Sequence, residues 1–539
     1  MSLCATISQF LLELLSFVIV RTFDTVKYLF HQGFRDGRQR VPPLRDAPFL
    51  QYSATKLAKM VRKGELTSEV LVTAAIARIR EVDPLLNAVV EDRFEAALRD
   101  ARRADQELAS FGGDLDALAK ARPFLGVPFT VKDCIGIKGM LADVGNESRR
   151  NERADEDAVL VRRLVAAGGI PLAITNVCEM CFWIESGNHV HGRTNNPHDL
   201  HRTSGGSSGG EAALISTYAS VWGVGTDITG SIRLPAAWCG LFGHKPTPGF
   251  VSRQGVLPHE GQDLKARIGV AGPLARSADD LIAMMRIIAD DPSKLRLDDS
   301  VDVSRLRYYF CDHEGSSFIS SVQPEVRKQV HRVVNFVKND LNVEPKPMPK
   351  PERISRHEEF WFATLAALDF PPLKSCYEPP EKAWEPLPEL MRHIGGMSTR
   401  SICAIVISLL DDFYRRDPDK CRKSCEDLEQ FKQDMNALLQ DDGVLVMPSS
   451  VSVAPFHHGT LCNPVLYLGF ASIVNVLKLP STVVPMGYDS RGLPLSVQIV
   501  AGYGQDRLTL AVARRLEEKF GGFVPPCKVS VVNGTNSST

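Results

Sequence analysis

The chain has 539 residues, of which 44% are hydrophobic and 24% charged, and its formal net charge at pH 7 is −1. A chain of this length can bury a large core, and its evenly mixed charges are unlike the concentrated basic surface of a nucleic-acid-binding protein. We therefore expect a globular protein and exclude nucleic acid as a main partner.

The first 20 residues predict an apolar helix. The apolar run from Phe10 to Val20 is shorter than the ~20 residues that a membrane-spanning helix needs, so it is either a marginal span or an interfacial helix. We interpret residues 1–40 as a membrane anchor with a basic flank. Apolar residues recur at helical spacing and basic residues follow them: Ile7, Phe10, Leu11, Leu14, Leu15, Val18 and Ile19, then Arg21, Lys27, Arg35, Arg38 and Arg40.

The basic flank also predicts which side of the membrane the rest of the chain occupies. Basic residues beside an apolar segment mark the cytoplasmic side, so we expect the main body of the chain to face the cytoplasm. Two glycosylation sequons near the C-terminus, Asn533-Gly-Thr and Asn536-Ser-Ser, argue for the opposite side. Such tripeptides arise often by chance in a polar tail, so we rank them below the charge bias.

Residues 41–120 have a helical pattern. We predict a helix around Leu57–Val61 capped by Ser53 or Thr55, a second helix that follows Ser68 and runs through Ile79, and a third over Phe94–Leu108. Short apolar strands then alternate with helices, which predicts an α/β sheet. The strands are Pro128–Val131, Ile170–Ile174, Val444–Met447, Thr482–Val484 and Leu495–Val500, and the helices include Ala158–Ala167 and Arg507–Phe520.

Three further segments have distinct patterns. The apolar stretch Asn176–Trp183, which contains Cys178 and Cys181, predicts a buried helix with reduced, structural thiols. Residues 300–440 are rich in charged and aromatic residues, and we predict a helical elaboration near the substrate entrance, with a plain surface insertion as the alternative. We take residues 41–525 as one catalytic domain and residues 526–539 as a polar C-terminal tail.

Three fragments carry groups suited to catalysis: Phe129–Asp133, Gly205–Glu211 and Gly225–Arg233. A serine hydroxyl is a weak nucleophile unless a neighbouring base removes its proton, and Lys132 is a candidate base. Each fragment alone has a simpler explanation. A glycine–serine run is usually a flexible loop, a lysine at a strand end is usually solvated, and Ser231 could cap a helix.

Together the fragments resemble the amidase signature family, and within it the fatty-acid amide hydrolase branch, in both order and spacing. The resemblance implies a large mixed central sheet covered by helices on both faces. It also implies a triad in which Lys132 is the base, Ser207 relays the proton after a cis peptide bond, and Ser231 is the nucleophile. The family works without a metal or an organic cofactor, so we expect neither here. The implied oxyanion hole consists of backbone N–H groups from Ile228, Thr229, Gly230 and Ser231.

Thr229 departs from the family pattern, which usually has glycine at that position. A β-branched residue in this turn could narrow the site or restrict the backbone. Asp227 and Arg233 flank the turn and could pair to brace it, or they could form an ordinary surface salt bridge. His244 suggests a Ser–His alternative, which we rank lower because no Gly-x-Ser-x-Gly sequence surrounds Ser231.

The chemistry requires an unusual state of Lys132. A lysine in water is a cation without a free electron pair, so it can accept a proton only where burial disfavours the ammonium form. We therefore expect Lys132 to be buried, uncharged and in contact with Ser207. An exposed Lys132 nitrogen would contradict the proposed mechanism.

The resemblance and the apolar N-terminus together imply a membrane-associated serine hydrolase. Its expected substrates are lipid-like fatty acid amides, either primary amides or N-acylethanolamines, which it would hydrolyse to fatty acid and amine. Two alternatives remain: an amidase for short-chain or aryl amides, and a catalytically silent membrane-associated binding protein. A homodimer is left open.

Overall fold

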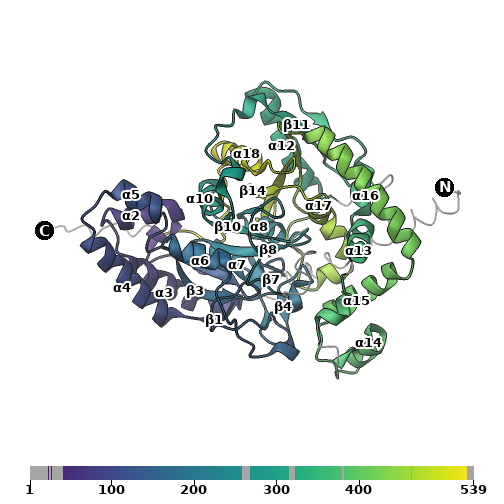
Figure 1. The fold of residues 1–539 in the computed structure, drawn as a ribbon, viewed down its shortest axis with the longest axis horizontal. Helices are drawn as coiled ribbons and strands as arrows, with labels where there is room; N and C mark the ends of the chain where they lie inside the picture. The colour runs from purple at the N-terminus through teal and green to yellow at the C-terminus, as the bar shows by residue number, and fades with distance from the viewer. Residues whose placement is uncertain are drawn as a thin grey trace.

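A computed structural model describes Thr22, Val26 and residues 40–257, 268–314, 322–368, 370–378, 382–462 and 464–530, without the side chains of residues 464–466 (Figure 1). Nearly all of the predicted anchor, residues 1–40, and both predicted sequons lie outside these ranges. Of the helices within them, none combines the length and the apolar character that a membrane crossing requires.

The core of the molecule is a sheet of eleven strands in the order β1-β3-β2-β8-β10-β9-β14-β15-β13-β11-β12. β2 runs parallel to β3 and β8, whereas β10, β9, β14 and β15 pair with their neighbours in antiparallel fashion. The predicted mixed sheet is therefore confirmed. Its strands are β1 Val89–Asp92, β2 Pro128–Lys132, β3 Ile170–Thr175, β8 Gly223–Asp227, β9 Phe242–Lys245, β10 Val270–Ala275, β11 Arg307–Phe310, β12 Lys346–Pro347, β13 Gly443–Pro448, β14 Ser481–Tyr488 and β15 Pro494–Ala501.

Helices pack around this sheet, and four short strands form two separate pairs. Before β10 the chain forms α2 Ala54–Arg62, α3 Ser68–Leu86, α4 Phe94–Ser110, α5 Leu115–Ala121, α6 Val159–Ala166, α7 Gly209–Ser216 and α8 Arg233–Cys239. After it come α10 Ala278–Ile288, α11 Pro292–Leu295, α17 Pro464–Val476 and α18 Asp506–Phe520. The short strands are β4 Gly187–Asn188, β5 Gly192–Arg193, β6 Asn195–Asn196 and β7 Asp199–Thr203.

Two neighbouring residues of β14 show that helices cover both faces of the sheet. Successive side chains of a strand point to opposite faces. The Thr482 hydroxyl lies 2.8 Å from Thr509 Oγ1 on α18. The Ser481 hydroxyl donates instead to Gln498 Oε1, which also accepts a hydrogen bond from Arg233 on α8. The predicted covering of both faces is thus present at β14.

The predicted strands and helices agree with the structure to within a few residues at each end, except that α3 continues to Leu86, beyond the predicted end at Ile79. The alternative caps for α2 are now resolved, because Ser53 Oγ accepts a hydrogen bond from the Lys56 backbone N–H at 3.2 Å. Thr67 caps α3 in the same way. Such caps satisfy N–H groups that the first turn of a helix leaves unpaired.

The prediction of a helix over Asn176–Trp183 is wrong. The segment contains only a short 3₁₀ turn, η3 Glu179–Cys181, and Met180 and Cys181 have φ values of 54° and 62°. A right-handed helix cannot continue through positive φ, and the Met180 N–H donates instead to the carbonyl of Val144. The predicted burial is correct for Cys178 and Met180. The cysteines in the described ranges are all free thiols.

Residues 300–440 are mainly helical, as predicted, and form the long green arc in Figure 1. Two short strands, β11 and β12, also lie in this region and extend the edge of the sheet, which the sequence analysis did not predict. The helices are α12 Pro324–Asp340, α13 His357–Ala367, α14 Pro386–Ile394, α15 Ile402–Arg415 and α16 Pro418–Leu439.

The described part of the predicted C-terminal tail is attached to the body of the protein. Val529 forms a parallel β-bridge with Leu44, and the Ser530 N–H donates to the Leu44 carbonyl at 2.9 Å. The remaining tail residues, 531–539, lie outside the described ranges.

Candidate active site

Adjacent parallel strands bring the predicted residues to one edge of the sheet. Lys132 is the last residue of β2, and β8, which pairs with β2, ends at Asp227. The turn after β8 carries Ser231, and Ser207 lies just before α7. Carboxyl ends of neighbouring parallel strands meet at the same edge, where α/β proteins commonly place their sites.

Lys132 is fully buried and contacts Ser207, as predicted. Its Nζ atom lies 2.6 Å from Ser207 Oγ and 2.8 Å from Thr226 Oγ1. The peptide bond between Gly206 and Ser207 is cis, which also agrees with the prediction. Thr226 was not singled out from the sequence, although it lies inside the fragment Gly225–Arg233. Only its position beside Lys132 reveals its part in the site.

Ser231 is held close to this pair by the backbone. Its carbonyl oxygen accepts a hydrogen bond from the Ser208 N–H at 3.2 Å, and only 3% of the residue is exposed. The two segments that carry Ser207 and Ser231 are therefore joined directly.

A buried ion pair closes the turn that carries Ser231. Arg233 Nε donates to Asp227 Oδ2 at 3.0 Å, and both side chains are completely buried. Burial by itself would raise the pKa of the Asp227 carboxyl, but the charge and hydrogen bonds of Arg233 outweigh it and lower that pKa to about 2. The pair therefore braces the turn and is not an ordinary surface salt bridge.

The turn itself explains which of its residues must be glycine. Gly230 has φ +119°, and a Cβ atom there would lie 2.6 Å from the Cβ of Ala471. Thr229 is not among the residues with positive φ, so its β-branched side chain does not force an unfavourable backbone conformation. Its side chain lines a pocket instead. Thr229 thus forms part of the pocket wall without an unfavourable backbone conformation.

The four predicted oxyanion-hole donors differ in their hydrogen bonds. The N–H group of Gly230 donates to Asp227 Oδ1 at 2.8 Å. For the N–H groups of Ile228, Thr229 and Ser231, we find no hydrogen-bond acceptor among the residues that the structure describes. These three groups are free to meet a substrate oxygen.

Glu211 is a buried carboxyl close to Lys132. It accepts hydrogen bonds from the hydroxyls of Thr130 and Thr175 at 2.9 and 2.8 Å. Burial raises the pKa of Glu211 to about 8, because a charged carboxylate is disfavoured away from water. Glu211 is therefore mostly protonated at neutral pH and adds little negative charge beside Lys132.

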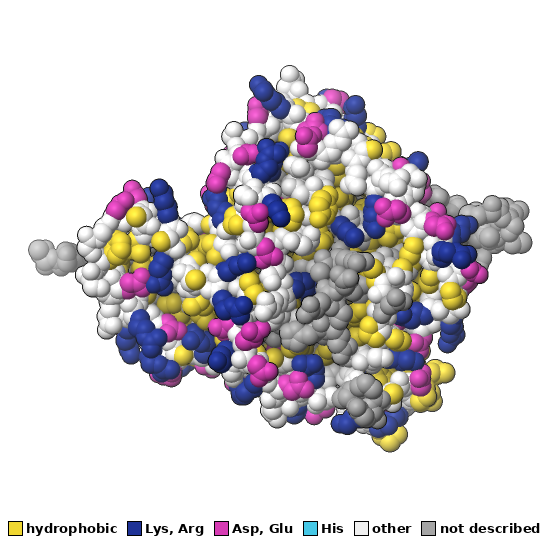
Figure 2. Space-filling view, in the orientation of Figure 1, with side chains coloured by type: hydrophobic (Ala, Val, Ile, Leu, Met, Phe, Trp, Pro, Cys, Tyr) yellow, Lys and Arg dark blue, Asp and Glu magenta, His cyan; other side chains and the backbone are white. Residues whose placement is uncertain are grey.

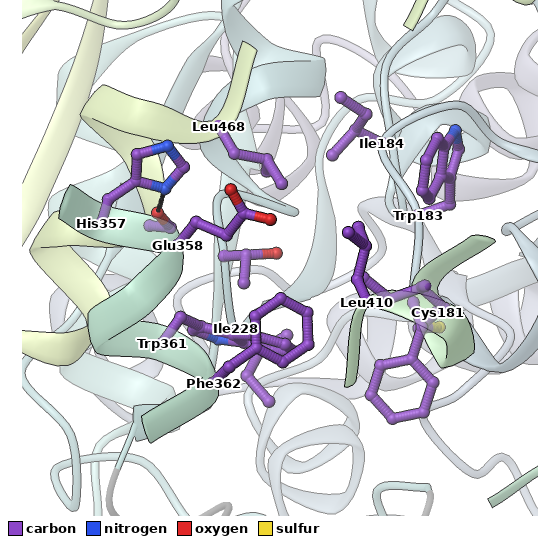
Figure 3. A pocket seen from close by; sticks show the side chains of 14 residues that line it. Cys181, Trp183, Ile184, Ile228, His357, Glu358, Trp361, Phe362, Leu410 and Leu468 are labelled. Atoms are coloured by element: carbon purple, nitrogen blue, oxygen red, sulfur yellow. Dashed lines mark hydrogen bonds between the residues drawn. The ribbon is translucent and has the colours of Figure 1, made fainter. Parts of the chain in front are cut away.

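An apolar pocket opens next to the turn (Figure 3). Helices α13, α15 and α17 and the segment around η3 form its walls. Apart from Ile228 and Thr229, which were expected in the oxyanion hole, these residues could not be assigned to a pocket from the sequence, because they come from segments far apart in the chain. They are Cys181, Phe182, Trp183, Ile184, Ile228, Thr229, His357, Glu358, Trp361, Phe362, Ile407, Leu410, Leu468 and Ser472.

His244 is placed where it cannot serve the alternative Ser–His mechanism. The side chain is fully buried, and its Nδ1 atom lies 2.9 Å from Thr482 Oγ1 while Nε2 lies 3.2 Å from Asp506 Oδ1. Both ring nitrogens are therefore engaged within the sheet and with α18. The geometry disfavours His244 as the base for Ser231.

One group of described residues has the composition of a metal site. Ligand atoms of Asp133, Asp143 and His191 all lie within 4.8 Å of one another. His191 Nε2 already contacts Asp143 Oδ1 at 2.8 Å, and burial raises the pKa of the Asp133 carboxyl well above its usual range. We assign this group no role in the proposed reaction.

Comparison with known proteins identifies the family. The family model described as Amidase matches residues 70–510. The chain belongs to the amidase family. It is 39% identical over 534 residues to fatty-acid amide hydrolase 2-A of Danio rerio, covering 97% of this chain and 98% of that protein. It is 38% identical over 536 residues to fatty-acid amide hydrolase 2 of Homo sapiens, covering 98% and 99%.

A solved structure supports the same fold. A fatty acid amide hydrolase matches this amidase with a TM-score of 0.71 and 22% identity, covering 93% of this chain and 90% of that one. The predicted family is therefore confirmed. Like other amidases, the protein is a hydrolase of amide C–N bonds.

Proposed function

We propose that this amidase is a membrane-associated serine hydrolase that cleaves fatty acid amides, such as primary amides or N-acylethanolamines. The observation that carries the proposal is the 2.6 Å contact between Lys132 Nζ and Ser207 Oγ in a fully buried position. This contact lies at the same sheet edge as the Ser231 turn, and that turn also lines the apolar pocket. In this proposal the base, the relay serine, the nucleophile and the acyl-binding pocket therefore form one site.

The proposed reaction begins with proton transfer toward Lys132. In the proposed mechanism the Lys132 amine accepts the Ser207 proton while Ser207 takes the proton of Ser231. Ser231 Oγ then bonds to the amide carbon, and the carbonyl oxygen becomes an oxyanion. The free N–H groups of Ile228, Thr229 and Ser231 stabilise that charge, and each such donor typically contributes about 2.7–4 kcal/mol.

The same protons complete the reaction. As the C–N bond breaks, Lys132 returns its proton through Ser207 to the leaving nitrogen, and the acyl group remains on Ser231. A water molecule then gives a proton to the relay and attacks the acyl carbon. The fatty acid leaves, and Ser231 recovers its proton. The first half of the cycle thus passes the Ser231 proton to the leaving amine, and water supplies its replacement in the second half.

The substrate class follows from the walls of the pocket. Side chains such as Trp361, Phe362, Leu410 and Leu468 favour a hydrocarbon chain, because burying apolar area contributes roughly 25 cal/mol per Å². The two fatty-acid amide hydrolase 2 relatives support the same class. Short-chain amides would leave much of this apolar wall uncovered.

Membrane association is supported by an exposed apolar face on α14. Leu387, Met391 and Ile394 repeat at helical spacing and are 64%, 63% and 72% exposed, and Met397 and Phe413 nearby are also exposed. Figure 2 shows hydrophobic side chains on the surface in this region. Phe413 lies on α15, the helix that also lends Ile407 and Leu410 to the pocket. A lipid amide in a membrane under this face would therefore lie near the pocket.

Two measurements test the proposed function. A fluorophosphonate should label Ser231 in the purified full-length protein, and Ser231→Ala should abolish labelling, whereas the buried helix residue Ser216→Ala is the control that keeps it. Turnover of octadecanamide should then exceed turnover of acetamide. If Ser231→Ala is still labelled, Ser231 is not the nucleophile. Equal turnover of both amides would refute the fatty acid class.

A further inference from the structure

Among the described residues that line the apolar pocket, Glu358 alone carries a carboxyl group. This residue lies in the first turn of α13, and Figure 3 shows its carboxyl directed into the pocket between Leu468 and the turn of Ile228. Among the described lining residues none is Lys or Arg. A carboxyl group in such a wall is costly to bury and does nothing to bind a hydrocarbon chain.

The residues around Glu358 offer its carboxyl group few polar partners. Burial raises the pKa of the Glu358 carboxyl to about 7, and the Tyr414 hydroxyl on α15 is its hydrogen-bonding neighbour. His357, which also lines the pocket, has its Nδ1 atom 2.7 Å from Ser472 Oγ. No lysine or arginine among the described lining residues is therefore available to pair with Glu358.

Glu359, the next residue of α13, is a glutamate with a structural role. Glu359 accepts hydrogen bonds from Arg356 and from the Ser424 hydroxyl, and its pKa is lowered. It belongs to an ion pair outside the pocket, whereas Glu358 faces the cavity. The contrast makes Glu359 a natural control for Glu358.

We propose that Glu358 is a specificity-determining residue that binds a hydroxyl group of the substrate, so that the enzyme prefers lipid amides bearing a hydroxyl over their pure hydrocarbon counterparts. This inference rests on the proposed function and narrows its substrate class. The hydroxyl could lie on the amine, as in a hydroxyalkyl amide, or on the acyl chain. Both sources present the same chemistry to the carboxyl.

A hydroxyl is the group that best matches this carboxyl. At neutral pH the carboxyl is present in both its protonated and its ionised form, because its pKa is about 7. A hydroxyl can accept a hydrogen bond from the first form and donate one to the second. An ether oxygen would suit only the protonated form. A hydrocarbon would cover the carboxyl without replacing its lost contact with water.

The test measures kcat/KM of the full-length protein for two matched pairs of amides. N-(2-hydroxyethyl)octadecenamide is compared with N-propyloctadecenamide, and 12-hydroxyoctadecanamide with octadecanamide. The wild type should prefer the hydroxylated member of at least one pair by about 10- to 100-fold, the range expected for one buried hydrogen bond. The pair that shows the preference identifies the source of the hydroxyl.

Variants then assign the preference to Glu358. Glu358→Leu should reduce it to about twofold or less while hydrolysis of the hydrocarbon member continues, and Glu358→Met is the second apolar variant if the first does not fold. Glu358→Gln keeps hydrogen-bonding atoms and should retain a preference. Glu359→Gln should behave like the wild type. An unchanged preference in both apolar variants, or no preference in the wild type, would overturn the proposal.

A separate readout distinguishes this inference from the proposed function. Each amide can be tested for protecting Ser231 against fluorophosphonate labelling, which requires binding but no turnover. If no amide is hydrolysed, the proposed function fails, yet the hydroxylated members should still protect at about tenfold lower concentration. Equal protection by both members of each pair would reject the role of Glu358 independently.

Discussion

Asp227 and Arg233 form a completely buried ion pair with two contacts of 3.0 Å, and the turn between them carries Ser231. Arg233 also reaches Asn475 on α17 and Gln498 on β15. The same side chain thus joins the turn that carries Ser231 to residues far away in the sequence, on α17 and β15. Stability and catalysis should therefore depend on it together.

We expect Arg233→Met to lower the free energy of unfolding by about 3–5 kcal/mol, because it leaves the Asp227 carboxylate buried without its partner. Fluorophosphonate labelling of Ser231 should fall as the turn loses its brace. Arg233→Lys should recover little, since an ammonium group cannot make the paired contacts of a guanidinium. Urea unfolding measures the loss. Arg286→Met, which removes a largely exposed pair with Asp298, should change stability by less than about 0.5 kcal/mol.

Gly230→Ala should inactivate the enzyme. The substitution places a Cβ atom 2.6 Å from Ala471 and forces a side chain into a residue with φ +119°. A positive φ alone costs on the order of 1–3 kcal/mol, and the clash adds to that. Gly487→Ala separates the two effects, because φ there is +99° but no atom lies within 4 Å. Comparable labelling of Ser231 in both variants would contradict this explanation.

Glu211 should make the protein less stable as the pH rises. Its pKa is about 8 in the folded protein against an ordinary 4.5, so between these values the folded chain holds a proton that the unfolded chain has released. Its contribution to stability is complete below about pH 4.5 and declines up to about pH 8. Glu211→Gln removes this dependence.

The free energy of unfolding of Glu211→Gln, taken relative to that of the wild type, should therefore be higher at pH 8.5 than at pH 5. The increase should be up to about 4 kcal/mol. Urea unfolding at both pH values measures the difference. Glu95→Gln, at an exposed position on α4, is the control and should show no such trend. The free energies of unfolding of the wild type and of Glu211→Gln could instead differ by the same amount at both pH values. That result would show that Glu211 is already ionised at neutral pH.

The sequence was sufficient for the parts of the site that depend on short fragments. Lys132 contacts Ser207 as expected from the family resemblance of the three fragments taken together, and Asp227 and Arg233 form the brace that was one of two alternatives. The helix predicted over Asn176–Trp183 is absent, because Met180 has a positive φ and its N–H donates to the Val144 carbonyl, a contact that local sequence does not reveal. The pocket could not be predicted, since Glu358 and Leu410 meet the catalytic turn only through the packing of α13 and α15.

The exposed face of α14 should bind membranes. Leu387→Glu, Met391→Glu and Ile394→Glu together should weaken association of the full-length protein with phosphatidylcholine vesicles by at least about tenfold, because each removes apolar area that would be buried in lipid and adds a charge. Vesicle flotation measures the association. Val70→Glu, Leu115→Glu and Val165→Glu form the matched control, since these apolar residues are also exposed but lie on other helices. Hydrolysis of a short, soluble amide should persist in both triple variants. If the α14 variant floats as well as its control, residues 1–40 alone must account for any membrane binding, and the α14 face has no part in it.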